Sequence, residues 1–318
     1  MIEGIPKISV LIICYKQEEL IKRAINSLLV QKDYLYEICV SDDCSPDNTW
    51  NVLLDYQRRY PDLIKLNRNE PNVGIFENIE RNWEMPTGDV VYQMAGDDEA
   101  VEGYFKSIIA FIREKKIDYK NELFCIYGDY MVKYPNGDSI VYHNSAVEEF
   151  PDVFRLALRG RICNRSACYS IRVLELFDKV SQGRSHKVEH VQDRQLQLHA
   201  EKNYYIPCVG NIYYASIGIS VHINDSIMQE RLEIWPFTLE YLNKKGIRLC
   251  ESDLNCIKLN MLHAQHRYGK KNAFDIIMRY IYRKGSKDKS FPKKRGRLKK
   301  VIFALRRRLP HKKPIHFE

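Results

Sequence analysis

Apolar and polar residues alternate along the first hundred positions in blocks that have the lengths of strands and helices. Residues 8–14 form an almost continuous apolar run rich in β-branched side chains, which predicts a strand buried on both faces of a parallel sheet. In residues 18–31 the apolar side chains recur at helical spacing. The alternation continues with predicted strands at 36–41, 63–67 and 90–95 and predicted helices at 46–60 and 75–84. Strands that alternate with helices favour an α/β fold with a doubly wound sheet.

The second part of the chain has a less regular pattern. The predicted elements are a helix near 101–116, a strand at 123–127, a hairpin turn at Asn136-Gly137, a helix at 153–159, a strand at 167–171 and a helix at 191–201. Residues 226–282 have the pattern of helices broken near Gly246 and Gly269. We predict one domain with helices on both faces of its sheet, followed by a mostly helical region. The predicted limits are 1–225 for the domain, with halves 1–100 and 101–225, 226–284 for a helical extension and 285–318 for a basic tail.

Positive charge is concentrated at one end of the chain. The net charge is +9, but residues 279–318 contain 16 Lys and Arg against two acidic residues, so this segment carries +14 and residues 1–278 carry −5. A basic tail suits an anionic membrane surface or a nucleic acid, and composition does not choose between them. Within the tail, residues 301–309 form a short basic amphipathic segment.

The nine cysteines bear on the cellular compartment. They are scattered singly without a C-x-x-C pair, which is typical neither of a zinc site nor of a disulfide framework. No basic-then-apolar leader precedes Ile8, and the longest apolar run is too short to cross a bilayer. The sequence therefore predicts a cytoplasmic protein, whose tail either docks at the inner face of the cell membrane or is only solvated.

Two carboxylates, Asp42 and Asp43, follow the second predicted strand. The residues after them have the pattern of an ordinary helix start, with Ser45 as N-cap and Pro46 in the first helical position. That interpretation leaves the two carboxylates unexplained. Adjacent like charges repel unless a cation or a hydrogen-bond donor lies between them, which makes this pair a candidate for ligand binding.

A second acidic group, Asp97-Asp98-Glu99, follows the strand at 90–95, and Gly96 permits a close approach of the backbone. Ligands of α/β sheets bind beyond the carboxyl ends of the strands, so both acidic groups and Tyr15 are expected at one rim. Carboxylate oxygens suit Mg²⁺ or Mn²⁺, which are typically held by one or two carboxylates and by the phosphates of a substrate. The two groups together predict a metal site.

An ordered set of sequence features resembles the family 2 glycosyltransferases, which have the GT-A fold. The features are the run 8–14 followed by Tyr15-Lys-Gln-Glu-Glu-Leu, then Ser27-Leu-Leu-Val-Gln31, Asp42-Asp43-Cys-Ser45, Asn72-Val-Gly74-Ile with Asn78, and Thr87-Gly88-Asp89-Val ahead of Gly96-Asp97-Asp98-Glu99. The resemblance covers about the first 100 residues well and residues 120–220 loosely.

The resemblance implies a role for each of four residues in the first half. Tyr15 would stack on the nucleotide base, and Asp43 would accept a hydrogen bond from that base. Asp97 would lie near the ribose or the metal. Asp98 would bind Mn²⁺ or Mg²⁺ directly.

The resemblance also places a catalytic base at the Asp of a Glu-Asp pair that starts a helix. The matching stretch is 190–198, which implies Asp193 as the base, with Gln192 in place of the usual Glu. Relatives often carry a basic residue and a His shortly after Tyr214, whereas this chain has none in residues 215–220. Positive charge for the diphosphate must then come from elsewhere, and His222 is one candidate.

The implied activity is a metal-dependent, inverting transfer of a sugar from a nucleoside diphosphate sugar, in particular a UDP-sugar. The acceptor would be a hydroxyl of a glycan or a lipid-linked molecule, in the synthesis of cell-surface polysaccharide or glycolipid. Two alternatives stay open. A sugar nucleotidyltransferase would be expected to have a Gly-rich phosphate loop after the first strand, where this chain has residues 15–18 without glycine. A non-catalytic nucleic-acid-binding protein could use the basic tail, but residues 1–278 are net acidic and contain no recognised binding motif.

Overall fold

The computed structural model describes residues 4–149, 163–179 and 189–215, and in the remainder residues 217, 235–236, 238–240, 242–244, 246, 249–268, 278 and 281–282. The chain divides into two compact units, Met1–Phe237 and Thr238–Glu318. The predicted limits at 225 and 284 stay predictions, because the residues around them lie outside the described residues. The basic tail, His222 and the helix predicted at 153–159 also lie outside them.

The first hundred residues of the first unit alternate between strands and helices as expected. The strands are β1 (Ile8–Cys14), β2 (Glu37–Asp42), β3 (Ile64–Arg68), β4 (Val90–Ala95) and the short β5 (Glu99–Ala100). The helices are α1 (Leu20–Leu29), α2 (Thr49–Arg59), α3 (Ile75–Asn82) and, just beyond, α4 (Tyr104–Glu114), with a 3₁₀ turn η1 (Lys32–Tyr34) after α1. Each predicted element of this part is present, with its ends shifted by at most three residues.

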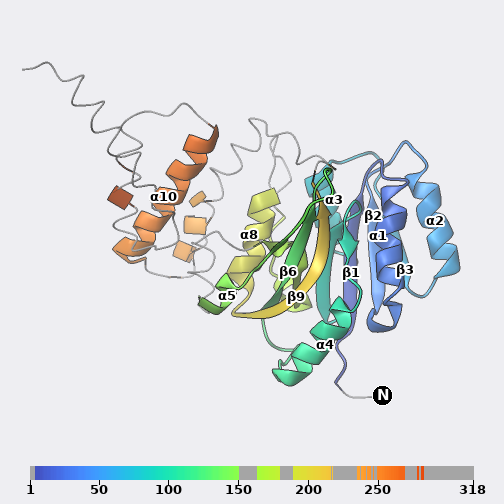
Figure 1. Cartoon of the computed structure of the whole chain (residues 1–318), viewed down its shortest axis with the longest axis horizontal. Helices are drawn as coiled ribbons and strands as arrows, with labels where there is room; N and C mark the ends of the chain where they lie inside the picture. Colours follow the sequence, from blue (N-terminus) through green and yellow to red (C-terminus); the bar gives the residue numbers. More distant parts are fainter. Residues whose placement is uncertain are drawn as a thin grey trace, which may run out of the picture. The chain divides into compact units, whose positions relative to one another are not determined.

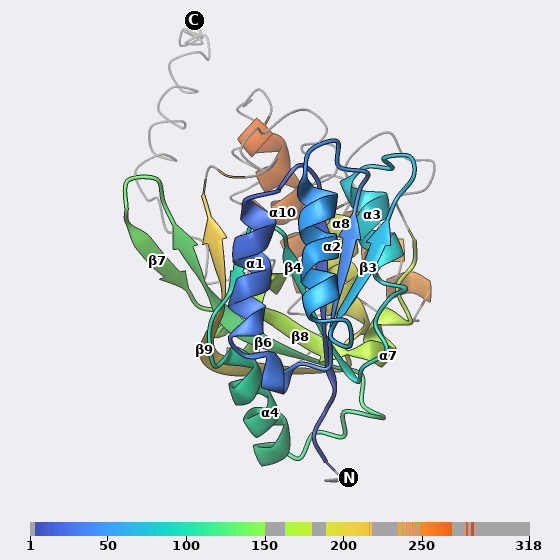
Figure 2. The ribbon, with the colours of Figure 1, turned by 90° about the vertical axis from the view of Figure 1, so that its right-hand side faces the viewer.

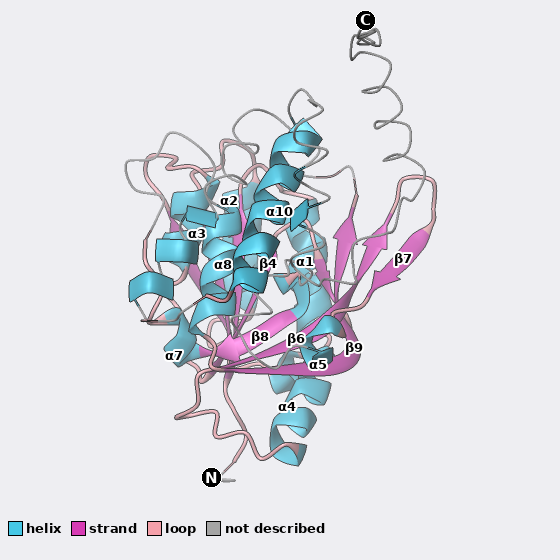
Figure 3. Ribbon diagram, turned by 90° about the vertical axis from the view of Figure 1, so that its left-hand side faces the viewer, coloured by secondary structure: helices cyan, strands magenta, loops and turns pink. Residues whose placement is uncertain are grey.

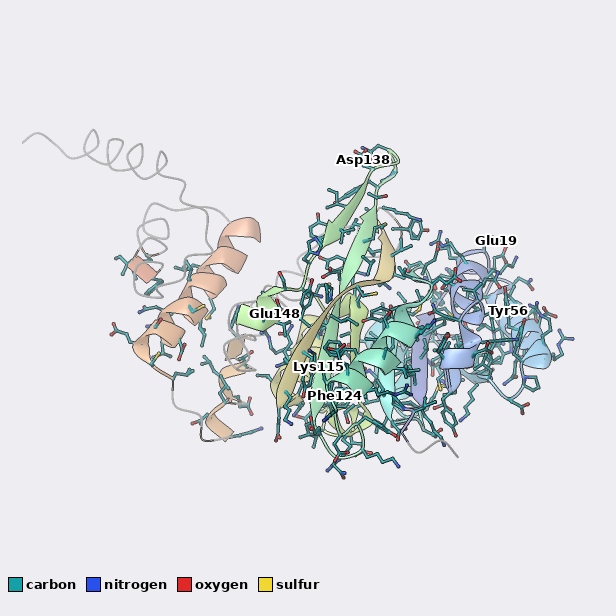
Figure 4. The ribbon with its side chains drawn as sticks, turned by 60° about the horizontal axis from the view of Figure 1, so that its bottom comes forward. Glu19, Tyr56, Lys115, Phe124, Asp138 and Glu148 are labelled. Carbon is teal, nitrogen blue, oxygen red and sulfur yellow. The ribbon has the colours of Figure 1, made fainter. Side chains whose placement is uncertain are left out.

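The rest of the first unit departs further from the prediction, because β6 is longer than the strand expected at 123–127. The strands are β6 (Phe124–Lys133), β7 (Ser139–Tyr142), β8 (Ala167–Ser170) and β9 (Lys202–Tyr214). The helical segments are α5 (Ala146–Glu149), η2 (Asn164–Ser166), α7 (Ile171–Leu174) and α8 (Glu189–His199). The predicted hairpin at Asn136-Gly137 joins β6 to β7, and Figure 4 labels Asp138 at its tip. The sequence did not predict β9, which runs beside β6 as a second long strand (Figure 1).

All nine described strands form one mixed sheet in the order β3-β2-β1-β4-β8-β6-β9-β5, with β7 paired to β6. Strands β1 to β4 are mutually parallel, whereas β8 is antiparallel to both of its neighbours, β4 and β6. The chain thus winds outward from β1 to β3 and then returns to the other side of β1 as β4. The sheet is therefore doubly wound only in its first half.

Helices cover both faces of the sheet because the side chains of the buried strands alternate between the faces. Val10 and Ile12 of β1 point into a core formed with α1, α2 and α4, and α1 and α2 lie in front of the sheet in Figure 2. Leu11 points into a second core that includes residues of α7 and α8, seen from the opposite side in Figure 3. Tyr56 on the inner side of α2 donates its hydroxyl to Asn26 of α1 at 2.9 Å, which joins the two helices (Figure 4).

Tyr104, the first residue of α4, is fully buried against the middle of β6 and β9. A Cβ added to Gly128 would lie 2.6 Å from its hydroxyl oxygen, and one added to Gly210 would lie 2.5 Å from its ring. Both strands therefore need glycine where the ring lies. The Tyr104 hydroxyl donates to the backbone oxygen of Ser166 at 2.6 Å, which anchors the η2 turn.

In the second unit, the described residues are helical where they are regular, and the longest element is α10 (Glu251–Tyr268). Within the part of the chain that the structure describes, no helix has both the length and the apolar composition needed to cross a membrane.

Candidate active site

The carboxyl ends of β1, β2 and β4 meet at one rim of the sheet. Cys14 at the end of β1 lies opposite Asp42 of β2, and Ile13 lies opposite Ala95 of β4. The strand order reverses between β1 and β4, and ligands of open α/β sheets bind at such switch points. The three strand ends that the sequence placed together do converge, so this rim is the candidate nucleotide site.

Tyr15 follows β1 directly and is 42% exposed. The next residue, Lys16, has a left-handed φ of 55°, and its N–H donates to Ser45 Oγ at 2.9 Å. The chain therefore turns sharply out of the sheet, which leaves the Tyr15 ring exposed at the rim. An exposed ring in this position suits stacking on a nucleotide base, which stays a prediction.

Ser45 does not cap a helix, so that prediction is wrong. Helix α2 begins at Thr49, whose N–H is held by Asp47 Oδ1 at 3.2 Å. Ser45 instead donates its N–H to Asp42 Oδ2 at 3.0 Å and its hydroxyl to Asp42 Oδ1. Because Asp42 is fully buried and accepts these bonds, it shapes the turn after β2 and is not presented to a ligand.

Asp43, which is 2% exposed, holds the loop that follows β3. Its carboxylate accepts the N–H groups of Val73 at 2.9 Å and Gly74 at 2.8 Å, and the amide of Asn69 at 3.0 Å. A carboxylate has about four acceptor positions, so three loop donors leave roughly one for another partner. The predicted hydrogen bond from a base to Asp43 is compatible with this geometry but stays a prediction.

Asp97 and Asp98 are buried at the tip of β4, with 9% and 3% of their surfaces exposed. Burial raises the pKa of both carboxyls, that of Asp98 to about 7, against the opposing effect of the Arg165 guanidinium. The backbone packs closely here, because a Cβ added to Gly96 would lie only 3.1 Å from the carbonyl oxygen of Ile13. The fold thus holds two adjacent carboxylates away from water, where a cationic ligand would stabilise their charge.

The third carboxylate of this group, Glu99, already has protein partners. It lies in β5, forms an ion pair with Arg23 at 3.0 Å and accepts the hydroxyl hydrogen of Tyr214. The Arg23 guanidinium also donates to the backbone oxygen of Asp97 at 2.5 Å. The candidate metal ligands of this segment are therefore Asp97 and Asp98, and Glu99 serves to fix the loop that carries them.

Two buried carboxylates fit Mg²⁺ or Mn²⁺ that is shared with a substrate. Among the described residues, no group of three or more His, Cys, Asp or Glu side chains forms a complete metal cage. Cations of this type are commonly held by one or two carboxylates plus the phosphates of a nucleotide. The donor set of Asp97 and Asp98 matches that second arrangement.

Asp193 lies on α8 and is exposed, about one turn inside the helix and not in its first position. The amide of Asn164 donates to its backbone oxygen at 2.9 Å. A cavity of about 270 Å³ brings Asp193 together with Asp98 of the rim. It is lined by Ile13, Ile75, Ile79, Trp83, Gln93, Met94, Ala95, Asp98, Cys163, Asn164, Arg165, Tyr169, Phe177, Gln192, Asp193 and Leu196.

Arg165, in the η2 turn, is a residue of this cavity that the sequence did not single out. Its Nη1 lies 3.4 Å from Asp98 Oδ2, and its guanidinium stacks 3.8 Å from the centre of the Tyr213 ring. A single Arg in a segment of irregular pattern has no local signal of function. Only the pairing of β8 and β9 with the rest of the sheet brings it to the rim.

The hydrogen bonds of the Gln192 side chain explain why Gln stands here in place of the expected Glu. It is 4% exposed, and its amide nitrogen donates to the Phe76 carbonyl at 3.0 Å and to Glu80 Oε1 at 2.9 Å. Both partner oxygens can only accept hydrogen bonds, and Glu80 is itself 2% exposed. A Glu at this position would bring a second buried carboxylate against Glu80.

We expect Gln192→Glu to lower the free energy of unfolding by about 3 kcal/mol, since it removes two donors and adds a buried charge. Urea unfolding of the purified variant measures this change. The double variant Gln192→Glu with Glu80→Gln restores one donor and should recover part of the loss. If the single variant is as stable as the wild type, the hydrogen bonds that the Gln192 amide donates do not stabilise the fold.

Comparison with known proteins gives the same assignment as the motifs. Residues 9–157 match the family described as Glycosyl transferase family 2. The Bacillus subtilis (strain 168) protein named "Putative glycosyltransferase EpsE" is 29% identical over 111 residues, which cover 35% of this chain and 40% of that protein. The chain thus aligns with less than half the length of this curated relative.

Solved structures extend the likeness of fold beyond the aligned segment. The structure of S. aureus TarS 1-349 in complex with UDP-GlcNAc has a TM-score of 0.58 at 18% identity, covering 88% of this chain and 78% of that one. The complex of the same TarS segment with UDP has a TM-score of 0.54 at 16% identity, covering 98% and 94%. The mixed sheet with helices on both faces is thus the GT-A-like fold that the sequence predicted. The family match over residues 9–157, the curated relative and the shared fold together support a glycosyltransferase of family 2.

Proposed function

We propose that this protein transfers a sugar, with inversion, from a UDP-sugar to a hydroxyl of a glycan or lipid-linked acceptor. The main support is that Asp98 and Asp193, which are 95 positions apart in sequence, line the same cavity beside the switch point of the sheet. One carboxylate is buried and the other is exposed, which suits two different roles. The solved TarS complexes with UDP and UDP-GlcNAc support a uridine nucleotide.

The donor would be held by groups at the rim. The Tyr15 ring would stack on the base and Asp43 would accept its hydrogen bond. Asp98 would hold Mg²⁺ or Mn²⁺, and Asp97 would lie near the ribose or the metal. Such an ion neutralises the charge of a diphosphate leaving group as a Lewis acid.

Asp193 would act on the acceptor. As the acceptor oxygen forms its bond to the anomeric carbon, the bond from that carbon to the diphosphate oxygen breaks and its electron pair leaves with the diphosphate. The hydroxyl proton passes to the Asp193 carboxylate, which acts as general base. Attack on the face opposite the leaving group inverts the anomeric configuration.

The acceptor side of the proposal has its support in the sequence. Residues 285–318 carry a strongly basic composition, and each Lys or Arg near an anionic lipid surface contributes about 1 kcal/mol of binding. A lipid-linked acceptor at the inner face of the cell membrane is consistent with such a tail. Synthesis of cell-surface polysaccharide or glycolipid is the pathway class we propose on this ground.

Binding of UDP to the wild-type chain and to Tyr15→Ala tests the donor site directly. We expect UDP to raise the melting temperature of the wild type in the presence of Mn²⁺. Tyr15→Ala should weaken the UDP affinity by about 5- to 150-fold, since stacking on one base is worth about 1–3 kcal/mol. Isothermal titration with UDP measures the change.

Tyr15→Phe is the control, because it keeps the ring and should retain most of the affinity. If the wild type binds no UDP, the proposed donor is wrong. If Tyr15→Ala binds UDP as tightly as the wild type, the base does not lie on this ring.

A further inference from the structure

Arg165 lies between the two parts of the candidate site. Its side chain is 30% exposed and its Nη1 is 3.4 Å from Asp98 Oδ2. The guanidinium stacks on Tyr213 of β9 at 3.8 Å from the ring centre. A stacked and paired arginine loses little further side-chain freedom when it binds a ligand.

Three parts of the fold fix the turn that carries Arg165. Tyr104 donates to the Ser166 backbone oxygen at 2.6 Å. Asn164 donates to the Asp193 backbone oxygen at 2.9 Å. On the other side, Asn144 donates its amide to the Cys163 carbonyl at 2.9 Å and accepts the Cys163 N–H at 3.1 Å. The guanidinium is therefore positioned before any ligand binds.

The charges around the cavity explain why a cation is needed at this point. Among the described residues that line the cavity, Asp98 and Asp193 are acidic, and Arg165 carries the only Lys or Arg charge. A diphosphate entering beside two carboxylates would be repelled by them. Arginine presents a planar fork of N–H donors that matches phosphate oxygens, and its charge does not depend on pH in the physiological range.

We propose that Arg165 binds the phosphate next to the sugar in the donor and stabilises the charge that this phosphate gains when the sugar leaves. This inference rests on the proposed function and adds a residue to it. The chain lacks a basic residue in 215–220, where relatives often have one, and Arg165 supplies the positive charge from the η2 turn instead.

The test compares the affinities of UDP and UMP, which differ by this phosphate. Titrations use the full chain as wild type, Arg165→Met, which keeps the aliphatic packing on Tyr213, and Arg165→Lys, which keeps the charge. Arg172→Met is the control, because Arg172 lies in α7 with its Nη1 on the Asn121 carbonyl at 2.8 Å. Each titration is made with Mn²⁺ and with EDTA.

We expect Arg165→Met to weaken UDP binding by at least about 10-fold, the value of a hydrogen bond to a charged group, with or without the metal. UMP binding should change by less than about 3-fold, Arg165→Lys should recover part of the UDP affinity, and Arg172→Met should behave as wild type. Unchanged UDP binding in Arg165→Met, or an equal loss for UDP and UMP, would overturn the proposal while leaving the proposed function in place. A wild-type chain that binds neither nucleotide would contradict the proposed function itself.

Discussion

Asp193→Asn is expected to slow sugar transfer by about 10²- to 10⁴-fold, the usual contribution of a positioned general base. The amide cannot take the proton of the acceptor hydroxyl, so the attacking oxygen stays a poor nucleophile. Because Asp193 is exposed on α8 and its side chain does not lie in the buried rim, we expect the fold and the UDP affinity to be retained. Turnover is measured as release of UDP from UDP-sugars in the presence of acceptor.

Asp62→Asn is a matched control for Asp193→Asn. Asp62 is an exposed carboxylate before β3, at the end of the sheet opposite to the rim, so its loss should leave turnover and affinity unchanged. Near-normal turnover in Asp193→Asn would remove Asp193 from the mechanism. A large loss of UDP affinity in that variant would assign the residue to donor binding.

Asp98→Asn is expected to reduce turnover by about 10³-fold, since Lewis-acid stabilisation of a leaving group is worth several kcal/mol. Unlike Asp193→Asn, this variant should also lose the effect of the metal on UDP affinity. Wild-type UDP affinity should be higher with Mn²⁺ than with EDTA, whereas the variant should show the same low affinity in both. Titration calorimetry with UDP in the two buffers measures this difference independently of turnover.

Loss of structure would not explain such a result. Asp98 is buried and burial raises its pKa to about 7, so a neutral side chain of the same shape is not expected to lower the melting temperature. A variant that keeps its response to Mn²⁺ would show that the metal is held elsewhere. A variant that melts well below the wild type would show that Asp98 is needed for the fold.

The first half of the fold could be predicted from the sequence because its signals are local and periodic. Strands buried on both faces, such as β1, give continuous apolar runs, and helices such as α1 give a clear apolar stripe. Because the carboxyl ends of parallel strands lie at the same edge of a sheet, the predicted strands suffice to place Tyr15, Asp43 and Asp98 at one rim. The error at Ser45 arose because its hydroxyl can bond a helix end or a nearby carboxylate, and local sequence does not decide which.

Strand β9 could not be predicted because it contains residues that usually argue against a strand. Pro207 and Gly210 interrupt its apolar pattern. In the pairing with β6 the register shifts between Tyr127–Tyr205 and Asp129–Val209, so four positions of β9 match two of β6. Pro207 lies in this bulge, where no ladder hydrogen bond is required of it.

The other side of the candidate site depends on distant pairings of this kind. Arg165 and Asp193 reach the cavity only when η2 and α8 pack beside β4 and β6. Asp193 was accessible to prediction through its resemblance to a family motif, whereas Arg165 belongs to no motif. The replacement of Glu by Gln at 192 was visible in the sequence, but its reason lies in the contact with Glu80.

The strand order has a consequence for how the chain folds as it leaves the ribosome. Strands β1 to β4 come from residues 8–95 and can pair as soon as they are made, whereas the next strand in the sheet, β8, comes from residues 167–170. Until then the edge of β4 has no partner strand, and unpaired edges are where nascent chains aggregate. The half that contains the candidate nucleotide site can therefore assemble first. The speed of translation between residues 95 and 167 then determines how long the edge of β4 stays unpaired.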